Sequence, residues 1–141
     1  MRTLILLTSG LVAAAALLGD QYLKPTPEAA QVKAGAALVS VTLPDTLTAK
    51  AEMGKLAFEA KCAVCHGINA AGNPEAAPPL VHIIYEPGHH SDESFQRAAA
   101  LGVQAHHWRF GNMPPVEGIT RAEVETIIAY IRELQRANGI F

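Results

Sequence analysis

The sequence predicts an all-α domain of about three to five helices, and two observations lead to this fold class. Three segments combine a helical spacing of apolar residues with capping residues, at about residues 49–61, 92–101 and 121–137. One further segment, residues 38–43, alternates like a strand, but no second strand is available to pair with it. We therefore expect helices joined by irregular segments.

The chain begins with an apolar segment typical of export. Residues 1–19 carry a single charge, at Arg2, and residues 4–18 are almost wholly apolar. Such a run is long for the core of a signal peptide and short for a helix that spans a bilayer. Small residues at 13–16 offer cleavage sites, but two leucines extend the apolar run beyond them. A cleaved signal peptide and a retained N-terminal membrane anchor therefore both stay open, and either carries the domain across a membrane.

Residues 20–47 are predicted to form an extended linker that leads into a domain at residues 48–141. Lys24-Pro25-Thr26-Pro27 favours extended backbone, and Pro44 ends the alternating run. Because this run has no pairing strand, we expect the lead-in to pack on the surface of the domain.

The first predicted helix spans about residues 49–61, with Thr46 or Thr48 as its N-cap, and it places Gly54 and Phe58 on one face. A glycine inside a helix costs about 1 kcal/mol relative to alanine. Close approach of another helix would explain Gly54, and a tolerated surface glycine is the alternative.

The last predicted helix, about residues 121–137, is the clearest of the chain. Thr120 and Glu123 form a capping-box pattern at its start. Its apolar stripe consists of Val124, Ile127, Ile128, Ile131 and Leu134. Ile127 and Tyr130 lie three residues apart, so this helix can present both to Gly54 and Phe58.

The predicted middle helix begins after Ser91, has acidic residues in its first turn and ends at Gly102. Its buried stripe is expected to contain Phe95, Ala98, Ala99 and Leu101.

Both cysteines of the chain lie in Cys62-Ala63-Val64-Cys65-His66, which has the C-x-x-C-H pattern that attaches c-type haem. Each thiol can add to one vinyl group of a porphyrin, and the adjacent histidine can bind the iron. A disulfide would close too small a loop to add much stability. A thioredoxin-like pair needs a βαβ context, and zinc needs further Cys or His ligands at set spacing. Neither a βαβ pattern around the motif nor such further ligands are apparent in the sequence.

Met113 lies in Gly111-Asn112-Met113-Pro114-Pro115, where the following proline disfavours helical backbone. A thioether on such a stiff loop can occupy the sixth position of a haem iron. Between the two sites, Pro78-Pro79-Leu80 could supply a backbone carbonyl to the second nitrogen of His66, and Leu80 could pack on the ring. Alone, this tripeptide is also compatible with an ordinary loop.

Together these residues resemble a class I cytochrome c over about residues 48–138. The family pairs its first and last helices crosswise through a pattern that Gly54, Phe58, Ile127 and Tyr130 match. Pro78, Leu80 and Met113 also match family positions, although Ala77 stands where a glycine is usual. The resemblance implies one covalently attached haem c, wrapped by the helices, with His66 and Met113 as the two axial ligands of its iron.

With both axial positions taken by the protein, the resemblance implies one-electron transfer and no enzyme activity. We expect a periplasmic electron carrier, free or tethered to the inner membrane by residues 4–18. A cytochrome c subunit of a larger periplasmic or membrane oxidoreductase is the alternative. A haem enzyme or gas sensor with a displaceable Met113 is a third possibility. No small-molecule substrate is expected, and the net charge of −2 suggests no nucleic-acid partner.

Redox partners are expected to dock at the exposed edge of the haem. By analogy with the family, this apolar patch consists of Ala63, Val64, Ile68, Pro114, Pro115 and Val116. Lys61 and Glu117, which flank it in the sequence, carry opposite charges. We therefore expect weak encounters that depend little on ionic strength.

The remaining polar candidates lie near the middle helix. Trp108 and Arg109 can donate hydrogen bonds to haem propionates, or can simply pack within their loop. The pairs His89-His90 and His106-His107 flank the helix. They could be solvated loop histidines, one of them near a propionate, or a second site for copper or zinc.

Overall fold

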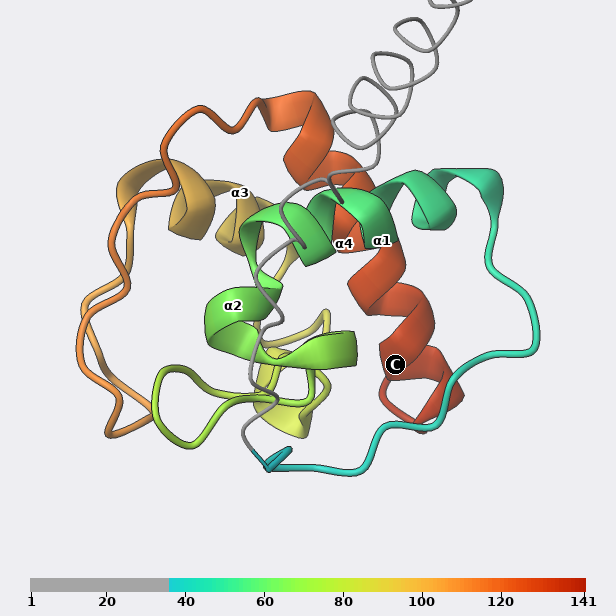
Figure 1. The fold of residues 1–141 in the computed structure, drawn as a ribbon, viewed down its shortest axis with the longest axis horizontal. Helices are drawn as coiled ribbons and strands as arrows, with labels where there is room; N and C mark the ends of the chain where they lie inside the picture. The colour runs from blue at the N-terminus through green and yellow to red at the C-terminus, as the bar shows by residue number, and fades with distance from the viewer. Residues whose placement is uncertain (1–35) are drawn as a thin grey trace, which may run out of the picture. The chain divides into compact units, whose positions relative to one another are not determined.

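The computed structural model describes residues 36–141, so the export segment predicted at 1–19 lies outside the described residues. The described part contains four α-helices and two short 3₁₀ turns, and its only β-pairing is two isolated bridges (Figure 1). The elements are α1 (Ala49–Lys61), α2 (Ala63–His66), η1 (Ile68–Ala70), η2 (Ile83–Tyr85), α3 (Asp92–Leu101) and α4 (Arg121–Ala137). The all-α prediction is therefore confirmed. No helix within residues 36–141 is long and apolar enough to cross a membrane.

Capping residues mark the starts of α1 and α4 and the end of α3, as the sequence predicts. At the start of α1, the Thr48 hydroxyl accepts a hydrogen bond from the Ala51 N–H at 3.3 Å. At the start of α4, the Glu123 N–H donates to the Thr120 hydroxyl and the Thr120 N–H donates to the Glu123 carboxylate, which completes the capping box. Helix α3 ends at Gly102, whose φ of 75° is readily adopted only by glycine.

Helices α1 and α4 cross and form the centre of the domain (Figure 1). A Cβ atom built on Gly54 would lie 1.9 Å from the Thr126 carbonyl oxygen, so the glycine allows the two backbones to touch. The rings of Phe58 and Tyr130 pack with their centroids 5.8 Å apart. The predicted contact between the two helices is confirmed, and a tolerated surface glycine is excluded.

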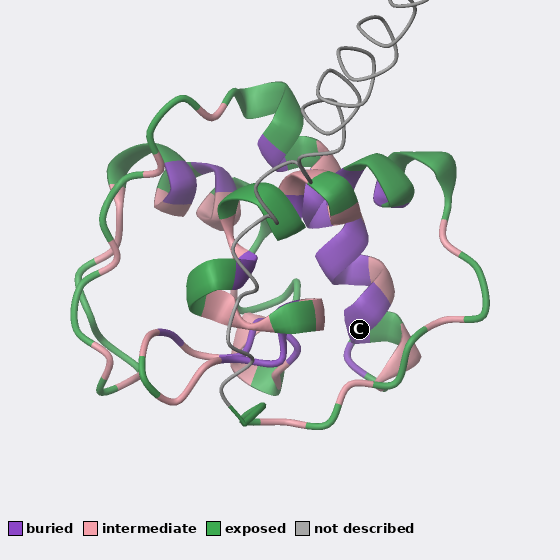
Figure 2. Cartoon of the chain, in the orientation of Figure 1, coloured by how far each residue is buried: buried purple, intermediate pink, exposed green. Residues whose placement is uncertain are grey.

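The buried residues of α4 face the interior over most of its length (Figure 2). Val124, Ile127, Ile128, Ile131 and Leu134 are all buried, as the stripe predicts. In α3 the prediction is wrong at one position, because Leu101 is 70% exposed. Gln96 is buried in its place, and its side-chain amide donates to the Arg121 carbonyl at 3.0 Å.

Two buried polar side chains of α4 hold the loop that precedes α3. The Arg132 guanidinium donates to the carbonyls of Tyr85 and His90 and pairs with Asp92 at 2.9 Å. Gln135 donates to the carbonyls of Leu80 and Tyr85. Satisfying these carbonyls avoids the cost of about 1–3 kcal/mol for each unpaired buried polar group. The network therefore fixes the loop that leads from Leu80 to the start of α3.

The lead-in runs in irregular conformation over residues 38–48. The Leu38 and Val39 N–H groups donate to the Ala71 carbonyl, and Thr42 exchanges two hydrogen bonds with the Asn138 side chain. Its position on the domain is thus set by hydrogen bonds to the segment at Ala71 and to the end of α4, without a pairing strand.

The buried hydroxyl of Tyr130 gives a prediction about pH. This hydroxyl donates to the Asn69 side chain at 3.1 Å, and burial raises the pKa of Tyr130 to about 12, with Glu59 and Glu52 adding to the rise. Because an unfolded tyrosine has a pKa of about 10, the contribution of the hydroxyl is complete below about pH 10 and is lost as the pH rises toward 12.

We therefore expect Tyr130→Phe to lower the free energy of unfolding by about 1 kcal/mol at pH 7. The difference from wild type should shrink between about pH 10 and 12. Denaturant unfolding of the haem-loaded protein at a series of pH values measures this difference. A difference that stays constant up to pH 12 would contradict the argument.

Candidate haem site

The two cysteines and the histidine of the attachment motif lie on one tight turn after α1. Cys62 ends α1 and precedes α2, its N–H donating to the Phe58 carbonyl at 2.8 Å. Cys65 and His66 lie within α2, where the His66 N–H donates to the Cys62 carbonyl at 2.9 Å. All three residues line one cavity of about 820 Å³. The sequence C-x-x-C-H therefore folds locally into a turn that presents two thiols and an imidazole to the same space.

The two cysteines form neither a disulfide nor part of a metal-ligand group in the described residues. Both cysteines are free, and burial raises the pKa of the Cys62 thiol to about 11, with Cys65 adding to the rise. Among residues 36–141, neither cysteine belongs to a group of three closely spaced metal-ligating side chains. A disulfide and a zinc site thus both lack support in the described part of the chain.

The His66 ring is held in the orientation that an iron ligand needs. Its Nδ1 lies 2.9 Å from the Pro78 carbonyl oxygen. Since a carbonyl only accepts, Nδ1 carries the proton and Nε2 keeps a free lone pair. Burial lowers the pKa of His66, against the opposing effect of this hydrogen bond, so the neutral ring is favoured. The structure places the carbonyl of Pro78 where the sequence analysis expects it.

Met113 is held by backbone hydrogen bonds and lines the same cavity as His66. It pairs with Val103 through two N–H···O bonds of 2.9 Å each. The Asn112 side chain accepts from the Ala105 N–H across the same loop. Gly102 lies against this pairing, because a Cβ atom on it would be 2.5 Å from the Met113 carbonyl oxygen. These bonds therefore fix the backbone of Met113 independently of any bond that its sulfur makes.

Of the other predicted haem-binding residues, some line the cavity and one does not. Leu80 and Trp108 line the cavity, and the Trp108 indole N–H is buried without a hydrogen-bond partner. The Tyr85 hydroxyl lies near the indole, although without hydrogen-bond geometry. Arg109 is exposed and is not among the lining residues, whereas Arg97 of α3 lines the cavity. Sequence reasoning missed Arg97 because it lies on the polar side of the helical stripe.

The lining as a whole fits a covalently attached porphyrin. Two thiols can hold its edge, an imidazole with a free Nε2 and a thioether can bind an iron, and an unpaired indole N–H can donate to a propionate. The walls between these groups are largely apolar. An all-α domain with these features belongs to the class of single-haem proteins with c-type attachment.

The family described as Cytochrome c matches residues 51–135, which is more than half of the chain, so the chain belongs to this family. Its haem is therefore c-type and covalently bound, and its general activity is haem-based electron transfer with redox protein partners. A comparison with curated proteins gives no match.

The unpaired indole N–H predicts a specific effect of Trp108→Phe. In the haem-loaded protein, this N–H is expected to donate to a propionate, and a hydrogen bond to a charged group contributes about 1.5–3 kcal/mol. We expect the variant to lower the free energy of unfolding by about this amount, measured by denaturant unfolding at pH 7. Arg109→Gln, at the exposed neighbour, is the control and should change stability by less than about 0.5 kcal/mol. Equal effects of the two variants would contradict this role of the indole.

Proposed function

We propose that this protein is a one-electron carrier whose haem iron is closed on both sides by His66 and Met113. The observation that carries the proposal is that an oriented imidazole and a methionine with a fixed backbone line one cavity. The bound haem supplies the change between Fe(II) and Fe(III). The chain supplies the two ligands, and its rigid backbone keeps their positions constant between the two states. Two protein ligands leave no position for oxygen, peroxide or another substrate.

Carbon monoxide tests this proposal directly, because it binds ferrous haem only where a coordination position is open. The reduced wild-type protein at neutral pH should show no spectral change on adding the gas. Rapid formation of a carbon monoxide complex would instead favour a gas sensor or haem enzyme with a displaceable Met113.

We propose further that partners dock on an apolar patch near the haem edge. Val64 and Ile68 are 60% and 51% exposed, and Pro114 and Pro115 are also exposed. Val116 is half-buried. The sequence-based patch is wrong at Ala63, which is only 4% exposed because it lies on the inner side of α2. The proposed patch therefore consists of Val64, Ile68, Pro114, Pro115 and Val116.

Such a patch predicts electron-transfer rates that depend weakly on salt. Lys61 and Glu117 are both exposed and have opposite charges, so neither sign dominates beside the patch. The bimolecular rate with a redox partner should change by less than about twofold between low and physiological ionic strength. Ile68→Lys should introduce a salt dependence where wild type has almost none. A steep salt dependence of the wild-type rate would remove the apolar patch.

The periplasmic location is also a proposal, and it rests on the apolar residues 4–18. N-terminal sequencing of the mature protein, combined with membrane fractionation, distinguishes a free carrier from a tethered one. Recovery of the haem-loaded protein in the cytoplasm would contradict this location.

A further inference from the structure

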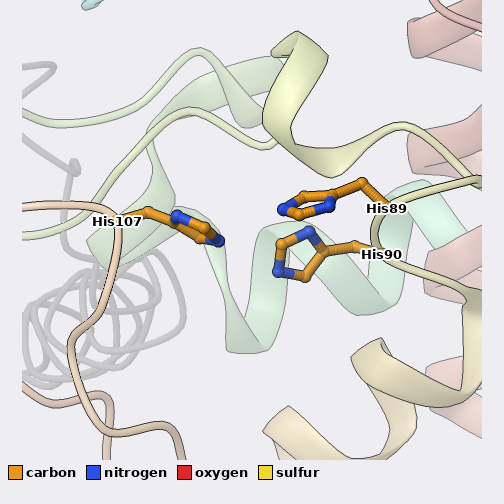
Figure 3. A group of neighbouring side chains, drawn as sticks. All are labelled: His89, His90 and His107. Atoms are coloured by element: carbon orange, nitrogen blue, oxygen red, sulfur yellow. The ribbon is translucent and has the colours of Figure 1, made fainter.

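Three histidines from two separate loops lie together beside the haem cavity. His89 and His90 come from the loop before α3, and His107 comes from the loop after it (Figure 3). One ring nitrogen from each lies within 4.8 Å of the others. Figure 3 shows the rings of His89 and His90 directed toward that of His107. His90 and His107 also line the haem cavity, whereas His89 does not, so the group lies at the margin of the cavity.

The backbone already orients one of these rings as metal sites require. The Nδ1 of His90 lies 2.6 Å from the Ile84 carbonyl oxygen, so Nδ1 carries a proton and Nε2 is left free. This is the arrangement that the Pro78 carbonyl gives His66. A hydrogen bond to the second nitrogen fixes the tautomer and makes the ring a better ligand. The carbonyl of His90 in turn accepts from the buried Arg132, so the backbone at this position is anchored to α4.

We infer that His89, His90 and His107 form a binding site for a divalent transition-metal ion, separate from the haem iron. Imidazole nitrogens suit Cu²⁺ and Zn²⁺, and nitrogen sites generally bind Cu²⁺ more tightly than Zn²⁺. Three imidazoles leave room for a fourth ligand, as in zinc sites that keep one open position. His106 is the nearest further imidazole, with its ring centroid 4.2 Å from that of His107. It lies outside the group of three.

The site can form without a large rearrangement of the chain. The ring centroids of the three histidines are 4.8–5.4 Å apart, so small rotations bring one nitrogen from each toward a common centre. His89 and His107 are exposed, which leaves their rings free to make such rotations. Both loops are fixed near their bases, one by Arg132 and the other by the pairing of Val103 with Met113.

The test is a titration of the haem-loaded protein, freed of every metal ion except the haem iron, with Cu²⁺ in competition with a chelating indicator. We expect one tight Cu²⁺ per chain and copper electron paramagnetic resonance with hyperfine structure from several nitrogens. His89→Gln and His107→Gln should each weaken this binding by about tenfold or more. Both positions are exposed, so the variants should fold, and an unchanged haem spectrum checks this.

His82→Asn is the control, since His82 lies outside the group and an asparagine oxygen can keep accepting from the Ile84 N–H, as the His82 ring does at 3.2 Å. It should leave Cu²⁺ affinity unchanged. In the same titration with Zn²⁺, all proteins should bind more weakly, and their affinities should rank in the same order as for Cu²⁺. Equal Cu²⁺ binding by wild type and the His89→Gln/His107→Gln double variant would overturn the inference. An equal loss of Cu²⁺ affinity on His82→Asn would also overturn it. Neither result would bear on His66 or Met113, because the haem spectrum and the carbon monoxide test report on those ligands separately.

Discussion

Gly54→Ala is expected to lower the free energy of unfolding by about 3 kcal/mol or more, although alanine is the better helix former. A new Cβ atom would lie 1.9 Å from the Thr126 carbonyl oxygen and 2.4 Å from its carbonyl carbon. Both are backbone atoms of α4, so no side chain can move aside to relieve the clash. Helices α1 and α4 would have to separate, which loosens the packing of Phe58 on Tyr130.

Whether alanine destabilises or stabilises the protein distinguishes a Gly54 in close contact with α4 from an exposed one. Were Gly54 in an exposed position, alanine would stabilise the helix by about 1 kcal/mol. Gly88→Ala is the matched control, because a Cβ atom there has no neighbour within 4 Å and its φ is not positive. Denaturant unfolding of both haem-loaded variants, followed through the haem absorbance, gives the comparison. A Gly54→Ala protein as stable as wild type would contradict the close approach of the two helices.

The elements that could be predicted from the sequence are those with local signals at their ends. The bounds of α1 and α4 follow from Thr48 and from the Thr120–Glu123 pair, each of which satisfies an N–H group within its own first turn. The exposure of Leu101 could not be predicted in this way, because it depends on how α3 lies against α4. Periodicity places a residue on a face of its helix, but only tertiary packing decides how far that face extends.

The burial of two polar side chains of α4 could not be predicted from the sequence either. Arg132 and Gln135 lie four residues after Ile128 and Ile131, on the buried face of α4, and both are buried although they are polar. Their partners are backbone carbonyls at Tyr85 and nearby positions, some fifty residues away along the chain. No spacing rule connects an arginine to the carbonyls of a distant irregular loop. Such networks are visible only once the loop has been placed.

In the candidate haem site, too, the residues with a local sequence signal could be predicted and the others could not. Cys62, Cys65 and His66 are recognisable because c-type attachment requires them at fixed local spacing. Met113 is recognisable because a methionine before a proline is not in a helix. The sequence does not show that Arg97 lines the cavity and Arg109 does not, since this depends on how α3 and the loop that carries Arg109 lie against the cavity. The three-histidine group likewise joins two loops that only the fold brings together.

Met113→Ala is expected to change the haem more than any other single substitution outside the attachment motif. A thioether ligand favours Fe(II), so its loss should lower the midpoint potential by a sizeable part of the roughly 0.8 V range that axial ligands set. It should also let reduced protein bind carbon monoxide. The loop should stay in place, because both hydrogen bonds to Val103 come from the backbone of residue 113 and alanine keeps them.

Met53→Ala is the control for loss of a methionine as such. Met53 lies on α1, is 57% exposed and does not line the cavity. Visible spectra and potentiometric titration of the two variants beside wild type are the measurements, and Met53→Ala should match wild type in both. If Met113→Ala also kept the wild-type spectrum and potential, its sulfur would not be an iron ligand. The closed site would then need another sixth ligand, and His106 lines the same cavity.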